Sequence, residues 1–300
     1  SDVHQTQETF EFWRILGHLK KTTRDAEVIF GVHRTGRAPV EDVFSGDTRR
    51  AFTWGLTMEE RTMFKLAMAQ MLVEGGRKAA NLERAEKSIA DAAGGGAQIV
   101  VLPEALNHGW THPIANAEVD SIPDGESCAR LRAAARKHRI HVCAGLVERE
   151  GERNFNSAVL IGPTGEILLL HRKLNELEIG HPFYAQGDRL GVAHTSLGTI
   201  GVMICADAFA RGQVISRTLG LMGADIILSP SAWAVPSDHD NAREPYGRLW
   251  LDNYGTVARD FHLWIAGVSN VGPIAAGPWQ GRKCIGCSLL VGPDGNQVLM

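Results

Sequence analysis

One of the five cysteines, Cys205, occupies a position in the sequence that suits a nucleophile. It follows the apolar run 200–204, which suits a buried parallel strand, and the residues after it have the apolar spacing of a helix. At a strand-to-helix turn the unpaired N–H groups of the helix favour the thiolate, the form that attacks carbonyl carbon. We therefore expect a depressed thiol pKa at Cys205. A buried, inert cysteine is the alternative, because free cysteine is among the most buried residue types.

A carboxylate and an amine occupy comparable positions elsewhere in the chain. Glu104 follows the strand predicted over 99–102, and Lys173 follows the one predicted over 167–170. Alone, each residue would usually be solvated, but open α/β sheets gather their sites at the carboxyl ends of strands. A thiol needs a base for its proton, and the oxyanion of a tetrahedral intermediate needs a fixed positive donor. Together with Cys205, these residues predict acyl transfer to a cysteine.

The elements that must position these residues follow one another regularly from Met63 onward. Strands are predicted over 64–71, 98–102, 140–147, 225–229 and 263–269, with two more flanking the hairpin 162–165 and a last hairpin at 293–295. Helices are predicted over 77–93, 127–138 and 243–261, with one more after the cysteine.

Two pairs of segments resemble each other within this order. The stretch 96–104 resembles 223–231, and 160–165 resembles 290–295, at nearly equal offsets. Such repetition predicts an α/β protein of two similar halves, each a sheet with helices on one face, packed as a four-layer α-β-β-α sandwich. A Rossmann-like sheet is the competing architecture, but no Gly-x-Gly-x-x-Gly follows the first strand.

Residues 1–62 differ from the rest, because Gly, Pro, Arg and Asp interrupt brief apolar runs there. The apolar spacing near Phe12 predicts one short amphipathic helix among them. We expect this segment to be an N-terminal arm packed on the main domain or on a second subunit. Residues 63–300 are then expected to form that domain.

Composition narrows the partners and the compartment. The formal net charge is −3 and the basic residues are scattered, which argues against nucleic acid or an anionic membrane and leaves small molecules as partners. No apolar segment approaches the ~20 residues of a membrane span, and the first residues lack a secretory pattern. Five cysteines, an odd number, fit reduced thiols. The protein is expected to be soluble and cytoplasmic.

The motifs resemble the nitrilase superfamily of carbon–nitrogen hydrolases. Leu-Pro-Glu104, Arg-Lys173 and Ile-Cys205 match its Glu-Lys-Cys triad in order and approximate spacing. The likeness covers about residues 63–300 and extends to the Gly-Pro-x-Gly hairpins and to Ser-Pro-Ser-Ala-Trp233. It implies a nitrilase-like α-β-β-α sandwich, no metal or organic cofactor, and a homodimer or larger homo-oligomer.

The resemblance also implies roles for individual residues. Glu104 is expected to be the general base and Cys205 the nucleophile that accepts the acyl group. Lys173 is expected to stabilise the oxyanion together with the backbone N–H of Ala206.

Two details of the resemblance are less regular. Many members carry a second glutamate after the lysine that orients the site; Glu178 is the better match and Glu176 the rival. The sequence stops at Met300, just past the last hairpin, whereas family domains usually continue through a further strand and tail. A short or missing C-terminal tail is therefore expected.

The residues around the nucleophile favour an amide or N-carbamoyl substrate. True nitrilases commonly have Trp-Glu after the cysteine, whereas Ala206-Asp207 resembles the amidase and carbamoylase branch. Ala206, Asp207 and Trp233 are candidate substrate-binding residues. Positions 208 and 209 carry no arginine, which disfavours a substrate with a free carboxylate because its buried charge would lack a partner. Arg211 keeps such a substrate open.

The expected reaction is cysteine-dependent hydrolysis of a carbon–nitrogen bond through a thioester. Alternatives are a true nitrilase and a catalytically silent scaffold or assembly protein, for which the arm 1–62 is the motivating feature. A metal-dependent hydrolase would need clustered His and carboxylate ligands, and the sequence shows no such cluster.

Two other residue pairs are weaker candidates. Cys284 and Cys287 have redox or zinc spacing but no second cysteine pair, and on one strand they would point to opposite faces. His108 and His112 are four residues apart, but the glycine and proline beside them argue against a helix. They are interpreted as loop residues, with the site entrance as the alternative. Trp110 is a candidate pocket wall or core residue.

Overall fold

The computed structural model describes residues 27–32, 64–114 and 118–300. In this part of the chain the α-helices are α1 (Lys78–Gly94), α2 (Glu126–His138), α3 (Val214–Leu221) and α4 (Arg248–Phe261). Short 3-10 turns lie at Glu178–Gly180, Cys205–Phe209 and Arg211–Gln213. The strands are β1 (Glu27–Val32), β2 (Phe64–Ala69), β3 (Ile99–Val101), β4 (His141–Glu150), β5 (Arg153–Ile161), β6 (Ile167–Arg172), β7 (Val192–Thr195), β8 (Gly198–Val202), β9 (Ile226–Ser231), β10 (Ala234–Pro236), β11 (Trp264–Ser269), β12 (Val271–Pro273), β13 (Arg282–Ile285), β14 (Leu289–Val291) and β15 (Gln297–Leu299).

Two six-stranded sheets share one plan. The first has the order β1-β2-β3-β4-β5-β6 and the second β7-β8-β9-β11-β14-β15. In each, the first pair of neighbours is antiparallel, the next two are parallel and the last two antiparallel. The sequence echoes fall on matching strands, β3 with β9 and β5 with β14. The predicted two similar halves are confirmed.

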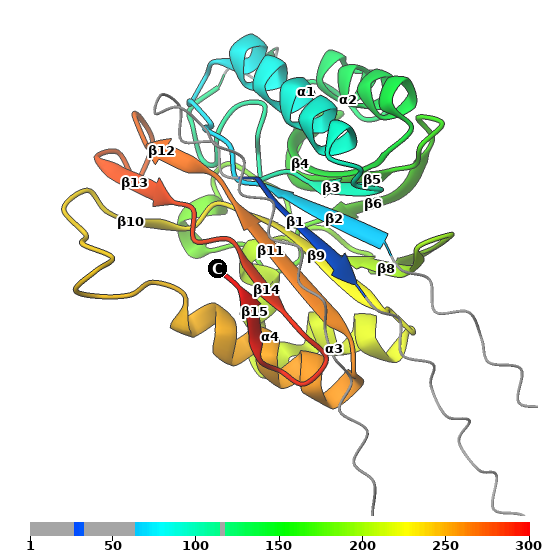
Figure 1. Ribbon diagram of the computed structural model, residues 1–300. Coiled ribbons are helices and arrows are strands. Elements are labelled where there is room, and N and C mark those ends of the chain that lie inside the picture. Colours follow the sequence, from blue (N-terminus) through cyan, green and yellow to red (C-terminus); the bar gives the residue numbers. More distant parts are fainter. Residues whose placement is uncertain (1–26, 33–63, 115–117) are drawn as a thin grey trace, which may run out of the picture.

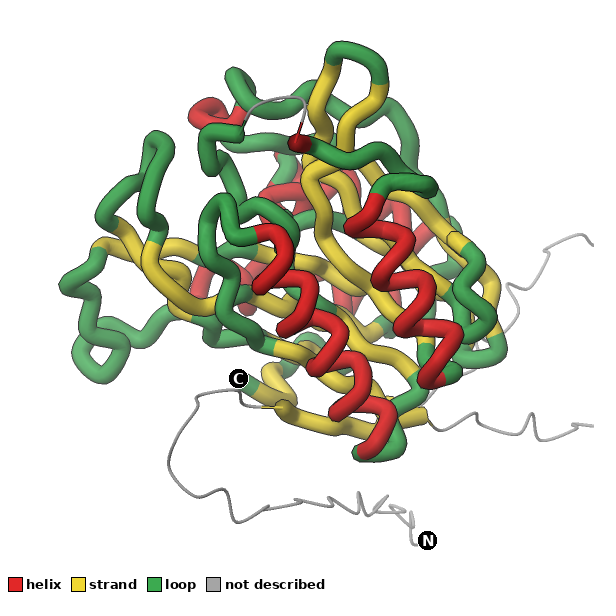
Figure 2. Tube along the Cα trace, turned by 90° about the horizontal axis from the view of Figure 1, so that it is seen from above, coloured by secondary structure: helices red, strands yellow, loops and turns green. Residues whose placement is uncertain are grey.

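The halves pack through their sheets (Figure 1). Helices α1 and α2 lie side by side over the outer face of the first sheet, where Figure 2 views them from above. Helices α3 and α4 cover the second sheet on the opposite side of the molecule. The predicted four-layer α-β-β-α sandwich is therefore correct.

Apolar spacing explains why these elements pack as they do. Helix α1 buries Leu82, Ala85 and Ile89 against the first sheet, three positions that recur on one face of a helix. A second cluster includes Ile99 of the first sheet and Ile200 of the second and reaches helix α4. Burial of this kind stabilises by about 25 cal/mol per Å² of apolar surface, so the sheet ends are held on a rigid support.

One strand falls inside the segment predicted as an arm. Strand β1 pairs antiparallel with β2, from Glu27 opposite Ala69 to Val32 opposite Phe64. The rest of the predicted arm, including the helix predicted near Phe12, lies outside the described residues. The division at residue 62 stays a prediction.

Two predicted helices begin later than expected. After Cys205 the chain forms a 3-10 turn, and Gly212 and Gln213 then adopt left-handed backbone conformations before α3 starts. Helix α4 starts at Arg248 rather than near 243, because Pro245 disfavours helical geometry in the residue before it. Both departures lie beside the cavity described below.

A small sheet of order β10-β13-β12 stands at one end of the sandwich. The chain between β12 and β13 carries Trp279, whose ring centroid lies 4.9 Å from that of Trp110 in the loop after β3. This sheet therefore brings an aromatic side chain from late in the chain to the loop that carries Glu104.

Candidate active site

The loop that carries Glu104 is fixed by close backbone packing. Glu104 follows β3, and Ala105 after it has a φ of 48°, a conformation uncommon for residues other than glycine. A Cβ on Gly145 of β4 would lie 2.5 Å from the Cα of Glu104, so only glycine fits there. The Glu104 backbone N–H donates to the Ser231 carbonyl across the two halves, at 3.2 Å. The backbone that carries the buried Glu104 carboxyl group is therefore held in a fixed position.

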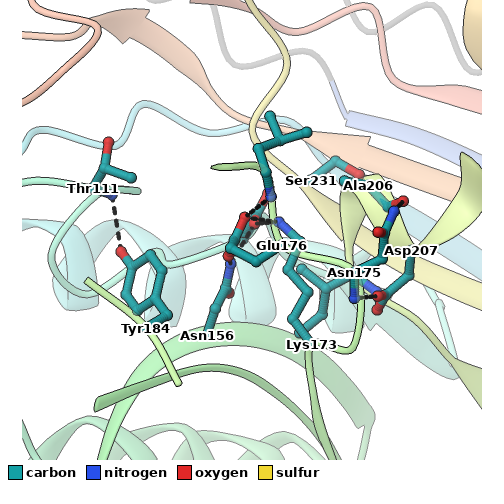
Figure 3. A network of polar contacts seen from close by, with 12 residues as sticks. Thr111, Asn156, Lys173, Asn175, Glu176, Tyr184, Ala206, Asp207 and Ser231 are labelled. Atoms are coloured by element: carbon teal, nitrogen blue, oxygen red, sulfur yellow. Dashed lines mark hydrogen bonds and ion pairs between the residues drawn. The ribbon is translucent and has the colours of Figure 1, made fainter. Parts of the chain in front are cut away.

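Four side chains form what we call the charged cluster: Glu104, Asn156, Lys173 and Glu176. Figure 3 labels the last three. Lys173 Nζ lies 2.8 Å from Glu104 Oε1 and 2.9 Å from Glu176 Oε1. Asn156 Nδ2 donates to both carboxylates, at 2.6 Å to Glu104 and 3.0 Å to Glu176. Because every member contacts two others, the cluster holds Glu104 and Lys173 in one arrangement.

Burial and charge set the protonation states of the cluster. Burial alone would lower the pKa of Lys173, but the carboxylates of Glu104 and Glu176 outweigh it and hold the pKa well above its ordinary value. Burial raises the pKa of Glu104, the charge of Glu176 adds to the rise, and Lys173 and Asn156 oppose it. The lysine is therefore a fixed cation beside a carboxylate of increased basicity.

Cys205 opens the 3-10 turn after β8 and has a φ of 44°, the left-handed region that side chains other than glycine rarely adopt. Burial raises the pKa of its thiol well above the ordinary value, and the Glu104 carboxylate adds to this. Lys173 and the Ala232 backbone N–H act in the opposite direction on that pKa. The expected depressed pKa is wrong, because burial outweighs the positive groups. At rest the thiol keeps its proton, so attack requires a base.

Asp207 does not contact the cavity, contrary to the prediction that it binds substrate. Its fully buried carboxylate accepts hydrogen bonds from the backbone N–H groups of Leu174, Asn175 and Ile204, at 3.0, 2.8 and 2.9 Å. It also lies 2.8 Å from His171 Nε2. Burial alone would raise the pKa of Asp207, but the hydrogen bond from His171 leads the effects that lower it. Asp207 therefore joins the loop after Lys173 to the turn that carries the cysteine.

Ala206 is also fully buried, and its carbonyl accepts a hydrogen bond from Asn175 Nδ2 at 2.7 Å. Its side chain is not among those that line the cavity. Its backbone N–H belongs to the first turn of a helix, where N–H groups have no partner within the helix. Contact with a substrate through this N–H, the role implied by the resemblance, stays a prediction.

A cavity of about 190 Å³ lies over Cys205, Glu104 and Lys173. Trp233 lines it, as predicted. Aromatic side chains supply much of the lining, and they are Trp110, Phe209, Trp233, Tyr246, Trp250 and Trp279. We call Phe209, Trp233, Tyr246 and Trp250 the aromatic wall; the rings of Trp233 and Trp250 stack with centroids 4.6 Å apart.

The second glutamate is Glu176 rather than Glu178. The side chain of Glu176 is 5% exposed and contacts Lys173, whereas Glu178 begins a 3-10 turn and is exposed. The prediction that placed Glu178 beside the lysine is therefore wrong.

Asn156 was missed by the sequence reasoning. It is a buried residue in the middle of β5, and its side chain turns toward the cluster rather than toward either apolar core. The sequence carries little signal for it, because Arg153, Asn154 and Ser157 in the same part of the strand are polar as well.

The weaker candidates lie apart from the charged cluster. Cys284 is buried on β13, whereas Cys287 lies beyond the end of that strand, so the prediction that placed both on one strand is wrong. His108 is buried, and His112 lines a separate small cavity with Trp110 and Cys284. Among the described residues no three His, Cys, Asp or Glu side chains are grouped so that they could hold a metal ion.

Comparison with known proteins assigns a family. The model of the family described as Carbon-nitrogen hydrolase matches residues 65–299. The chain belongs to the carbon–nitrogen hydrolase family. This carbon–nitrogen hydrolase is 36% identical over 179 residues to a nitrilase of Pyrococcus abyssi, which covers 58% of this chain and 67% of that protein. The membership confirms the resemblance found in the sequence.

Omega-amidases are also among the relatives. The chloroplastic omega-amidase of Arabidopsis thaliana is 29% identical over 249 residues, 78% of this chain and 63% of that one. An omega-amidase of Xenopus tropicalis is 32% identical over 180 residues, 57% of this chain and 64% of that one. The carbon–nitrogen hydrolase described here thus spans about two thirds of the length of the curated relatives that it matches.

Solved structures agree on the fold. The amidase from Nesterenkonia sp. AN1 superimposes with a TM-score of 0.66 at 22% identity, over 78% of this chain and 86% of that one. The carbon–nitrogen hydrolase from Helicobacter pylori G27 gives a TM-score of 0.67 at 24% identity, over 76% and 82% of the two chains. Both likenesses show the nitrilase-type sandwich.

Proposed function

We propose that this protein hydrolyses an amide or N-carbamoyl compound through a thioester on Cys205. The observation that carries the proposal is the contact of 2.8 Å between Lys173 and Glu104 at the floor of a cavity that Cys205 also lines. A base, a fixed cation and a thiol in one cavity are the groups that acyl transfer requires. The amidase names of several relatives agree with this chemistry.

In the first half of the reaction Glu104 takes the thiol proton as the sulfur attacks the carbonyl carbon. The carbonyl oxygen becomes an oxyanion. An ammonium group has three N–H donors, and two of those on Lys173 bond the glutamates, so one is left for the oxyanion. The Ala206 backbone N–H supplies a second donor. Glu104 then gives its proton to the leaving nitrogen, the C–N bond breaks, and ammonia or an amine departs from the thioester.

In the second half a water molecule replaces the departed amine. Glu104 takes a proton from this water as the oxygen attacks the thioester carbon, and the same donors stabilise the new oxyanion. The C–S bond then breaks, the sulfur recovers its proton from Glu104, and the acid leaves. Asn156 and Glu176 act as positioning residues, because they contact Glu104 and Lys173 rather than the thiol.

Ammonia release from a panel of amides, carbamoyl amines and nitriles tests this proposal, with Cys205→Ala as the control. We expect release from amides and none from the variant, and mass spectrometry of the stopped reaction should show the acyl group on the peptide that contains Cys205. Turnover that survives in Cys205→Ala would remove the nucleophile assignment.

A true nitrilase is the second candidate, because the relative from Pyrococcus abyssi bears that name. A nitrile carbon could accept the same thiol. The panel decides between the two: a kcat/KM for nitriles above that for every matched amide would favour the nitrilase reading.

We also propose that the protein forms a homodimer or larger homo-oligomer in the cytoplasm. Exposed apolar side chains on and beside α3, at Val214, Leu221 and Met222, support self-association. No helix in the described part of the chain is long and apolar enough to cross a membrane. Light scattering of the purified protein measures the assembly, and a monomer at working concentrations would contradict it.

A further inference from the structure

The cavity above Cys205 is divided between one polar end and an apolar remainder. Of the described residues that line it, only Glu104 and Lys173 carry a charge, and these two are bonded to each other. Elsewhere its surface comes from the aromatic wall, from Trp110 and Trp279, and from aliphatic side chains. The polar end is used by the reacting group, so the remainder must contact whatever is attached to that group.

We propose that this remainder binds the acyl chain of the substrate and selects an uncharged, apolar chain of about five carbons or a single aromatic ring. The inference rests on the proposed function for the identity of the reacting group. When ammonia leaves, the acyl chain stays bound to Cys205 until water attacks, so it is the acyl chain that occupies the cavity during the second half of the reaction.

The size of the cavity sets the size of the chain. Its volume is about 190 Å³, whereas an apolar cavity of roughly 150 Å³ in another protein stays dry and binds benzene. An aromatic ring or a short alkyl chain therefore fits together with the amide group. Burial of each methylene is expected to raise kcat/KM about fourfold until the cavity is full.

The polar groups of the wall are few and uncharged, and one of them, the indole Nε1 of Trp233, has no hydrogen-bond partner among the described residues. The Tyr246 hydroxyl oxygen accepts a hydrogen bond from Trp250 Nε1 at 2.8 Å. A carboxylate at the far end of the chain would need a guanidinium or several N–H donors, since burial of an unpaired charge is strongly unfavourable. A neutral chain incurs no such penalty.

Three arginines lie close enough in sequence or space to be considered as partners for a carboxylate. Arg248 begins α4, is exposed, pairs with Asp252 and does not line the cavity. Arg211 is exposed and does not line the cavity. Arg282 stacks over the outer ring of Trp279, with its guanidinium carbon 4.9 Å from the ring centroid, and does not line the cavity either. Arg282 is thus the rival explanation that the experiment must remove.

Three matched amides test the selection, because they differ only at the end of one three-methylene chain. Pentanamide ends in a methyl group, glutaramate in a carboxylate and 4-aminobutanamide in an ammonium group. We expect kcat/KM for pentanamide to exceed that for each charged amide at least tenfold. In Cys205→Ala, tryptophan fluorescence should show that pentanamide binds more tightly than either charged amide.

A gain-of-function variant sharpens the test. Leu249 lines the cavity, and its side chain is 54% exposed at the start of α4, so a longer side chain can be accommodated there. Leu249→Arg places a cation at the rim and should raise the ratio of glutaramate to pentanamide kcat/KM by tenfold or more. Ala129→Arg is the matched control, because Ala129 is exposed on α2 and outside the lining; it should leave that ratio unchanged.

The outcomes separate this inference from the proposed function. Preferential binding of pentanamide by Cys205→Ala, with no amide turned over by the wild type, would remove the proposed reaction and leave the apolar cavity standing. Equal or better use of glutaramate by the wild type would overturn the inference. If Arg282→Gln then abolished that preference, Arg282 would be the carboxylate partner in its place.

Discussion

The charged cluster and the aromatic wall meet over one cysteine, but they are built differently. All four members of the cluster come from the first sheet or the loops that follow its strands, and they are joined by hydrogen bonds of 2.6 to 3.0 Å. The wall comes from the second half, and its members touch mainly through ring packing, as in the stacked pair Trp233 and Trp250. The first arrangement fixes directions, and the second fixes a shape.

This difference predicts two kinds of mutational response. A hydrogen-bonded cluster that is buried loses a defined partner when any member changes, and the group left behind is unsatisfied. Packed rings tolerate volume changes in a graded way. Changes in the cluster should therefore lower the rate for every substrate, whereas changes in the wall should alter the choice among substrates.

The largest effect is expected from the cluster itself. Glu104→Gln keeps the shape of the side chain but cannot accept the thiol proton, so turnover should fall below detection while the fold remains. Lys173→Ala should reduce kcat by about 10²- to 10³-fold, the usual result of losing one oxyanion donor. Initial rates with several amides measure both, and circular dichroism checks the fold. A near-normal rate in either variant would contradict its assigned role.

Asp207, which joins the loop after Lys173 to the turn that carries Cys205, is expected to affect stability rather than chemistry. Asp207→Ala leaves one buried and two partly buried backbone N–H groups without their acceptor, and each buried unsatisfied donor costs about 1–3 kcal/mol. We expect the free energy of unfolding to fall by about 3 kcal/mol, measured by urea denaturation.

Asp260→Ala serves as the control for that measurement. Asp260 forms an exposed ion pair with Arg217, and such pairs contribute about 0–1 kcal/mol. If Asp207→Ala lowered the free energy of unfolding no more than this control, Asp207 would have no structural role.

Reactivity of the thiols compares the site with the rest of the chain. Cys205 should be alkylated by 2-chloroacetamide at least tenfold faster than Cys287, the only one of the five cysteines that is not buried. Although burial raises the pKa of both thiols, only Cys205 has a base beside it. Peptide mapping over time measures the two rates. Faster modification at Cys287 would argue against the site.

The smallest effects are shifts in pH dependence, and they have opposite signs for the two positioning residues. Glu104 must be ionised to act as a base, and its pKa is raised from the ordinary 4.5. The activity should therefore be lost, as the pH falls, at a higher pH than for an ordinary glutamate. Because the pKa of Lys173 lies well above 10.5, its deprotonation should not limit activity at or below that pH.

Variants of Asn156 and Glu176 test whether the loss of activity at low pH, the acid limb of the pH profile, is caused by protonation of Glu104. Asn156 lowers the pKa of Glu104 through a hydrogen bond, so Asn156→Leu should move the limb of kcat/KM to higher pH. Glu176 raises that pKa through its charge, so Glu176→Gln should move the limb to lower pH. A purely structural role for these residues would lower the rate without moving the limb in opposite directions.

Much of the scaffold could be predicted from the sequence, because buried strands and amphipathic helices leave periodic apolar patterns. Glu104, Lys173 and Cys205 could be singled out since each follows such a strand, and the structure does place Glu104 and Lys173 in contact. The choice between Glu176 and Glu178 failed because the intervening chain is irregular and has no period from which side-chain direction could be inferred.

Two further errors arose from treating sequence neighbours as spatial neighbours. Asp207 follows the nucleophile closely, but the 3-10 turn directs its carboxylate back into the protein. The thiol pKa was expected to fall because helix N–H groups were considered without the burial that accompanies them. Most of the wall was also invisible, because Tyr246 and Trp250 reach the site through a loop and helix whose position depends on tertiary packing.

The shared plan of the two sheets has an evolutionary consequence. Two halves with the same strand order are what duplication of a shorter ancestral gene would produce, and duplication gives every position a counterpart. The counterpart of Glu104, at the end of the matching strand β9, is Ser231, whose hydroxyl donates to the nearby Ser229 carbonyl. The doubled scaffold thus carries the proposed acid–base residue in one copy only, whereas the second copy supplies the aromatic wall of the cavity.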